Sequence, residues 1–99
     1  KKINLYPTIE RDLNFVLSEN QPIGEVLDTI RKLGRQLVVA AKPKNVYSDF
    51  DTLGDGKKSV TFSIVFQHSS KTLEDLDVNP IIDEIVTFAE KKFNAKLRT

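Results

Sequence analysis

Two stretches of the chain alternate between apolar and mainly polar residues, the pattern typical of a half-buried β-strand. In residues 11–18 the apolar positions on one face are Leu13, Phe15 and Leu17. In residues 59–66 they are Val60, Phe62, Ile64 and Phe66. Successive side chains of a strand point to opposite faces, so each stretch predicts one buried and one polar face.

Two other stretches have the three-and-four spacing of an amphipathic helix. The first is residues 23–33, and Gly34 is expected to end it as a C-terminal cap. The second has its apolar stripe at Ile81, Ile82, Ile85, Phe88, Ala89 and Phe93. Pro80 has no N–H to donate and is tolerated only in the first turn, so Asp77 or Asn79 is the expected cap. Thr72 or Glu74 could begin a preceding turn.

The remaining segments complete the order of elements. Residues 36–48 predict a strand that Pro43 restricts to a sheet edge or a bulge, and residues 49–57 predict a hairpin loop. Residues 95–98 predict a short final strand. The order βαββαβ predicts an α+β fold, a two-layer ferredoxin-like sandwich with both helices on one face of an antiparallel sheet. The first and third strands are expected to be central.

The sheet face away from the helices is the candidate functional surface. Alternation places Ser59, Thr61 and Ser63 on it, and Asn45 and Tyr47 share one face of the neighbouring strand. Three lysines are expected close by, namely Lys44, Lys57 and Lys58. Single-stranded RNA is bound on such platforms by stacking on aromatic rings, by bonds to base edges and by lysines near phosphates. A serine- and threonine-rich face is also typical of an ordinary solvated sheet.

Composition limits the class of protein. The 99 residues suffice for one domain, covering residues 1–99, and the absence of methionine indicates a fragment of a larger chain. The net charge is +1, so any basic surface must be local. Without cysteine there is no disulfide or thiolate chemistry. No apolar run is long enough to span a bilayer, so no membrane association is expected.

No residue pattern indicates catalysis or a metal site. His68 is the only histidine and is expected in a loop. Asp49, Asp51 and Asp55 lack the rest of an EF-hand pattern. Residues 54–59 lack the first glycine of a phosphate-binding loop and precede a strand instead of a helix. We therefore expect no catalytic residue, no metal and no cofactor in this domain.

Several short motifs occur together in order. They are Tyr6-Pro7, Arg11-Asp12-Leu13, Gly24-Glu25-Val26, Asn45-Val46-Tyr47, Gly56-Lys57-Lys58-Ser59, Lys71-Thr72-Leu73 and Leu97-Arg98. With them the whole chain resembles the ferredoxin-fold anticodon-binding domain that ends phenylalanyl-tRNA synthetase β subunits.

The resemblance implies binding of the anticodon stem-loop of tRNA-Phe. Asn45, Tyr47 and Ser59 match the positions that hold the wobble base in the family. Asn45 replaces an aspartate and loses the charge-assisted bond that a carboxylate makes to guanine. Lys44 replaces a phenylalanine and could attract phosphate. The resemblance further implies a cytoplasmic parent ligase with an α subunit as partner, whose aminoacylation site uses ATP and magnesium outside this chain.

Two other functions of the same fold stay open at this point. One is a dimeric regulatory domain that senses a small molecule such as an amino acid, although no glycine-rich turn follows the first strand. The other is a small enzyme of the acylphosphatase kind, which needs an anion-binding loop after the first strand. Residues 18–24, SENQPIG, offer little of that kind.

Overall fold

The chain adopts the predicted order of strands and helices. A computed structural model describes residues 6–48 and 53–98. Its elements are β1 Ile9–Ser18, α1 Ile23–Gly34, the 3₁₀ turn η1 Arg35–Leu37, β2 Val38–Tyr47, β3 Lys57–Phe66, α3 Asp75–Phe93 and β4 Lys96–Leu97. The short turn η1 was not predicted. The other bounds agree with the expected ones to within a few residues.

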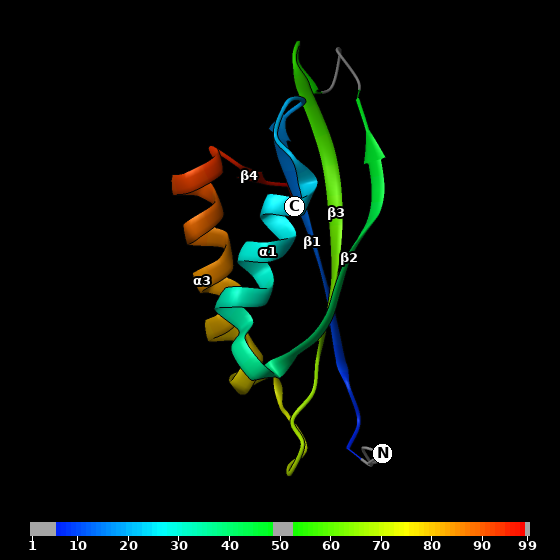
Figure 1. Cartoon of the computed structure of the whole chain (residues 1–99), viewed down its shortest axis with the longest axis vertical. Coiled ribbons are helices and arrows are strands. Elements are labelled where there is room, and N and C mark those ends of the chain that lie inside the picture. Colours follow the sequence, from blue (N-terminus) through cyan, green and yellow to red (C-terminus); the bar gives the residue numbers. More distant parts are fainter. Residues whose placement is uncertain (1–5, 49–52, 99) are drawn as a thin grey trace.

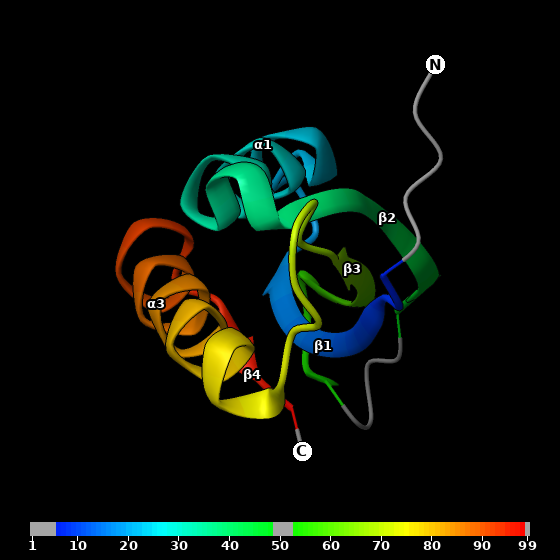
Figure 2. The same ribbon diagram turned by 90° about the horizontal axis from the view of Figure 1, so that it is seen from below.

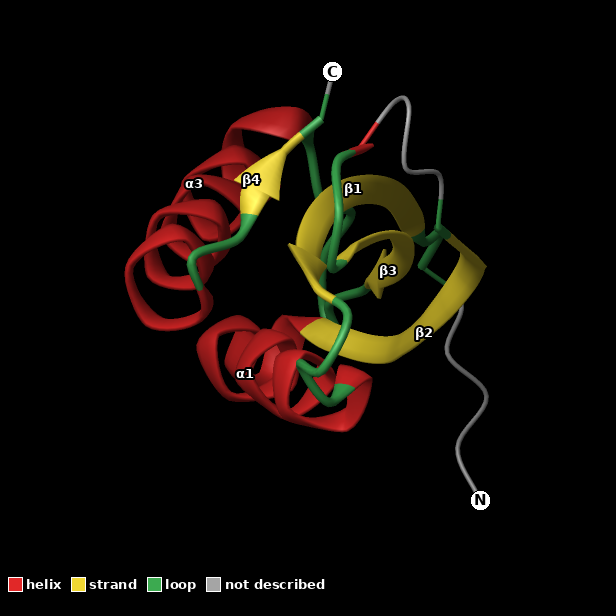
Figure 3. Cartoon of the chain, turned by 90° about the horizontal axis from the view of Figure 1, so that it is seen from above, coloured by secondary structure: helices red, strands yellow, loops and turns green. Residues whose placement is uncertain are grey.

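The strands form one antiparallel sheet in the order β2-β3-β1-β4. The first and third strands are central and the second is at an edge, as predicted. Both helices lie on the same side of this sheet (Figures 1 and 2). Viewed along the long axis, β1 and β2 curve around β3, so the sheet is strongly twisted (Figure 3). The ferredoxin-like α+β prediction is therefore confirmed.

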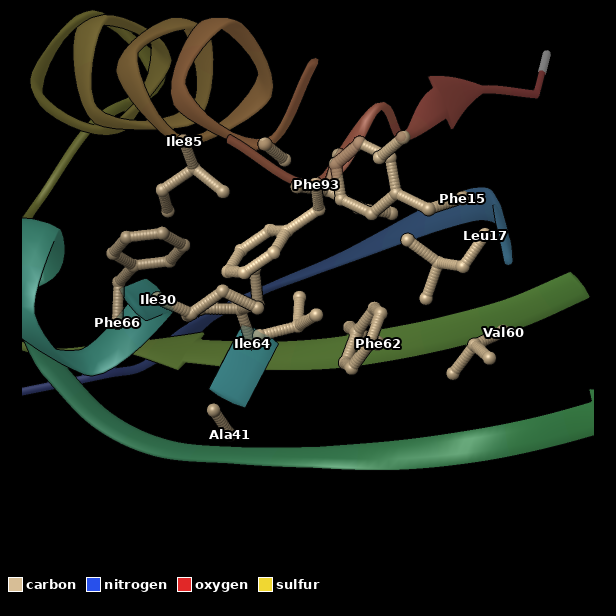
Figure 4. Close-up of a cluster of buried hydrophobic side chains, with 14 of the residues drawn as sticks. Phe15, Leu17, Ile30, Ala41, Val60, Phe62, Ile64, Phe66, Ile85 and Phe93 are labelled. Atoms are coloured by element: carbon tan, nitrogen blue, oxygen red, sulfur yellow. The ribbon is translucent and has the colours of Figure 1, made fainter. Parts of the chain in front are cut away.

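The hydrophobic core fills the space between the helices and the sheet (Figure 4). The two alternating strands contribute Phe15, Leu17, Val60, Phe62, Ile64 and Phe66, all with no solvent exposure. The helices contribute Val26, Ile30, Val78, Ile85, Ala89 and Phe93. The rings of Phe15 and Phe62 pack at a tilt of 58° with their centres 6.2 Å apart. The period-two pattern thus correctly predicted the inward face of both central strands.

The expected cap at the end of α1 is wrong. Gly34 is a buried helical residue with φ −74°, and the capping residue is Arg35, whose φ is +54°. A Cβ on Gly34 would lie 2.0 Å from a methyl carbon of Val38. Glycine is therefore required here for close packing of the helix end against β2, while the positive φ falls on Arg35 instead.

For the start of α3, the expected caps Asp77 and Asn79 are wrong, whereas the alternative start at Glu74 is observed. The helix begins at Asp75 with Glu74 as its cap, so Pro80 lies inside it. The Asp77 carboxylate accepts a bond from the Glu74 backbone N–H at 2.9 Å, as part of a capping box. This box and the burial of Val78 stabilise the first turn, which offsets the hydrogen bond that Pro80 cannot make.

The edge strand β2 has the expected irregularity. Its pairing with β3 shifts between Pro43 and Asn45, so the prediction of a bulge or edge position is confirmed. The hairpin loop joins β2 to β3, but Asp49 and Asp51 lie outside the described residues. The final strand is shorter than expected, covering Lys96–Leu97 only.

Candidate nucleic-acid interface

The register of the sheet brings most of the predicted residues to one face. Tyr47 pairs with Ser59, and Asn45 pairs with Thr61. On the other side of β3, Thr61 pairs with Asn14. Directly paired residues of an antiparallel sheet point the same way, so these side chains lie opposite the helices. We call this surface, made of Asn14, Asn45, Tyr47, Ser59 and Thr61, the polar face.

The polar face is not open to solvent at every position. Ser59 is only 1% exposed, and its hydroxyl donates to Asn14 Oδ1 at 2.9 Å. The amide of Asn14 in turn donates to Thr61 Oγ1 at 2.8 Å. The expectation that Ser59 lines a solvent-facing surface is therefore wrong, since the twisted strands let the polar side chains bond to one another.

A second bonded pair lies further along β1 and β3. The hydroxyl of Ser63 donates to Glu10 Oε2 at 2.6 Å, and Ser63 is as buried as Ser59. Among the described residues, no buried side-chain nitrogen or oxygen lacks a partner. The polar side of the sheet is thus a satisfied hydrogen-bond network and not a bare row of hydroxyls.

Lys44 is neutralised by an acidic neighbour. It lies in the bulge of β2, and its Nζ is 2.9 Å from Asp12 Oδ2 on β1. The hydrogen bond to Asp12 and the charges of Asp12 and Glu10 raise the pKa of Lys44 above its ordinary value. The lysine is therefore charged at neutral pH but carries a counter-ion, which weakens its attraction for a phosphate.

Lys57 and Lys58 lie on opposite sides of the sheet. Lys57 is exposed and two residues from Ser59, so it belongs to the polar side. Lys58 pairs with the core residue Leu17 and donates from Nζ to the Gln21 carbonyl oxygen at 2.6 Å. The structure therefore brings Lys57 to the polar face and Lys58 to the helix side.

Arg98 is a residue of this surface to which the sequence reasoning gave no role. Its backbone N–H donates to the Asn14 carbonyl oxygen at 2.7 Å, and its guanidinium donates to the Tyr47 hydroxyl. The available signal was alternation in the last strand, because Lys96 pairs with Val16 on the polar side and Arg98 is two residues further on. A two-residue strand is too short for this pattern to stand out in the sequence.

The described part of the chain contains no group of three or more residues that could hold a metal ion. His68 follows β3 in a loop, and its Nδ1 accepts a bond from the Ser70 backbone at 3.0 Å. None of the helices described is both long and apolar enough to cross a membrane.

Comparisons with known proteins point to one family. Residues 4–98 match the model of the ferredoxin-fold anticodon binding domain. The chain is 34% identical over 96 residues to a phenylalanine–tRNA ligase β subunit of Coxiella burnetii, covering 97% of this chain. It is 36% identical over 98 residues to that of Prochlorococcus marinus, covering 99%. A third relative, from Oceanobacillus iheyensis, is 36% identical over 94 residues. The chain spans 12% of the length of each of these relatives.

Proposed function

Because this chain belongs to the ferredoxin-fold anticodon binding domain family, we propose that it binds the anticodon stem-loop of tRNA-Phe as one domain of a phenylalanine–tRNA ligase β subunit. The observation that carries this proposal is the family match over residues 4–98. The similarity to three ligase β subunits over nearly the whole chain supports it.

The chemistry of the polar face fits a single-stranded RNA loop. Tyr47 is 43% exposed and offers an aromatic ring on which a base can stack. Asn45 is exposed beside it, and its amide can both donate to and accept from a base edge. Lys57 and Arg98 supply positive charge at this face, where phosphates of the loop would lie.

Catalysis belongs to other parts of the parent enzyme in this proposal. The domain supplies a docking surface, and its own residues take no part in the chemical step. Aminoacylation, with ATP and magnesium, takes place outside this chain, and the α subunit is a partner of the full-length β subunit. As part of the translation machinery, the parent enzyme works in the cytoplasm.

A titration of labelled anticodon stem-loop into the 99-residue chain tests the proposal. Tyr47→Ala removes the stacking ring and is expected to weaken binding by about 1–3 kcal/mol. Lys57→Ala is expected to reduce the slope of log K against log salt by about 0.7, since one phosphate contact is lost. Lys32→Ala is the matched control, because Lys32 is an exposed lysine on α1, on the helix side.

Two results would contradict the proposal in different ways. If the unaltered chain does not bind the tRNA-Phe stem-loop more tightly than an unrelated stem-loop, the proposed function is wrong. If it does, but Tyr47→Ala and Lys57→Ala bind as well as Lys32→Ala, then RNA binds to another face.

A further inference from the structure

The residue least accessible on the polar face is one that the family resemblance places against the wobble base. Ser59 lies on that face, yet it is 1% exposed and bonded to Asn14. Neither α1 nor α3 covers this side of the sheet (Figures 1 and 2). Among the described residues, side chains of the neighbouring strands lie close to it, as does Leu53, which borders one hollow together with Val16 and Arg98.

Arg98 and Tyr47 are positioned to cover Ser59. Tyr47 is paired with Ser59 on the edge strand β2, while Arg98 is bonded through its backbone to Asn14 beside the opposite edge. Their side chains meet across β1 and β3, where the guanidinium donates to the phenolic oxygen. The line between them passes over the bond from Ser59 to Asn14, because these two residues lie on the intervening strands.

The contact leaves the faces of the tyrosine ring available. The guanidinium carbon of Arg98 is 5.9 Å from the Tyr47 ring centre, at the outer limit of a cation–π contact. Since the same group donates to the phenolic oxygen, it lies beyond the hydroxyl end of the ring and not above its centre. The contact therefore holds the hydroxyl across the sheet without replacing a stacked base.

We propose that Arg98 is a residue of the RNA site and keeps it closed in the free protein. Binding exchanges its bond with the Tyr47 hydroxyl for a bond with a phosphate oxygen of the RNA. This exchange uncovers Ser59 and Asn14 for a base. The inference rests on the proposed function, because it takes RNA as the ligand of this face.

The exchange is favourable because the two acceptors differ in charge. A phenolic oxygen is a neutral acceptor, whereas a phosphate oxygen is anionic and can accept two guanidinium N–H groups at once. Both bonds have the ionised guanidinium as donor, and the bond to phosphate adds the opposite charge and a second N–H contact. The RNA phosphate is therefore a stronger acceptor for the Arg98 guanidinium than the Tyr47 hydroxyl that it replaces.

The first experiment needs no RNA. The chain has two tyrosines and no tryptophan, so Tyr6→Phe leaves Tyr47 as the only strong fluorophore. In that background, Arg98→Ala is expected to raise the acrylamide quenching of Tyr47 fluorescence, since the hydroxyl end of the ring loses its cover. Lys96→Ala removes a neighbouring charge of the same strand and is the control. Equal quenching in all three proteins would overturn the closed state.

The second experiment measures stem-loop binding by Tyr47→Phe. This substitution keeps the ring and Arg98 but removes the acceptor that holds the site closed. Affinity is expected to rise about 10-fold, which corresponds to roughly 1.5 kcal/mol for one hydrogen bond with a charged donor. Tyr6→Phe is the control and should leave affinity unchanged. Weaker or unchanged binding by Tyr47→Phe would overturn the proposal, because the hydroxyl would then serve RNA directly or play no part.

A salt titration tests the new partner of Arg98. Arg98→Gln is expected to lower the slope of log K against log salt by about 0.7, whereas Tyr47→Phe keeps the slope of the unaltered chain. An unchanged slope in Arg98→Gln would overturn the exchange with phosphate. If the unaltered chain binds no stem-loop, the proposed function and the exchange both fail, while the quenching comparison still decides whether Arg98 closes the face.

Discussion

Both faces of β3 contain buried residues, but the two faces are buried by different means. On the helix side, Phe62 and Ile64 have no solvent exposure and pack against apolar side chains of both helices. On the polar side, Ser59 and Ser63 are each 1% exposed, although this side faces away from α1 and α3. Their partners are polar side chains of β1, Asn14 and Glu10.

The comparison shows that apolar packing and hydrogen bonding serve different purposes on the two faces. Apolar packing is non-directional and scales with the area removed from water, so the helix side contributes most of the stability. A hydrogen-bonded network adds less, since each bond replaces one made to water. The hydrogen-bonded network instead requires particular partners at particular positions. Such bonds suit a binding surface, because a ligand with matching donors and acceptors can replace them.

The largest effect is expected on the helix side. Phe62→Ala removes a fully buried ring from the centre of the core and should lower the free energy of unfolding by about 3–5 kcal/mol. Val46→Ala, at a residue 52% exposed on the adjoining edge strand, is the control and should cost below about 1 kcal/mol. Urea denaturation measures both. Similar losses for the two variants would show that the core does not lie where the alternation places it.

An intermediate effect is expected on the polar side. Asn14→Ala leaves the hydroxyls of Ser59 and Thr61 without their shared partner and should cost about 1–3 kcal/mol. In a double-mutant cycle with Ser59→Ala, the two losses should be less than additive, because both remove the same bond. Strict additivity would mean that the bond between Ser59 and Asn14 contributes nothing to stability.

The smallest effect is expected from the exposed ion pair of Lys44 and Asp12. The folded protein raises the pKa of Lys44 above its ordinary value of 10.5, mainly through its hydrogen bond to Asp12. The pair's stabilisation is thus fully present below the unfolded pKa and is lost as pH rises through the folded pKa. Thermal unfolding between pH 9 and 12 (about one unit or more to either side of that value) should show a steeper fall for the unaltered chain than for Lys44→Met. Parallel curves would contradict the assigned pair.

Much of the fold was predictable because it depends on local periodicity. The period of two in residues 11–18 and 59–66 assigned the core face of both central strands correctly. The errors concern helix ends. At the end of α1, Gly34 is needed because Val38, four residues later, packs closely against it. At the start of α3, Pro80 is accommodated because a capping box begins six residues before it. Both depend on packing that periodicity does not report.

The candidate site divides in the same way. Alternation was sufficient to place Tyr47, Asn45 and Ser59 on one face, and the register confirms that arrangement. Alternation gave no indication that Ser59 is buried or that the Arg98 guanidinium bonds to Tyr47. It also did not show that Lys58 bonds to the Gln21 carbonyl on the helix side of the sheet. Their role in binding RNA stays a prediction.

The sequence by itself determined which residues lie on each face of the sheet and, through its motifs, the family. Side-chain direction in a strand follows from position alone, so this information is local. Only the tertiary structure decided which polar groups are accessible. Residues Asn14, Ser59 and Arg98 are far apart in the chain and meet because β1 lies between β3 and β4. The twist of the sheet then brings Arg98 within bonding distance of Tyr47 on the opposite edge strand.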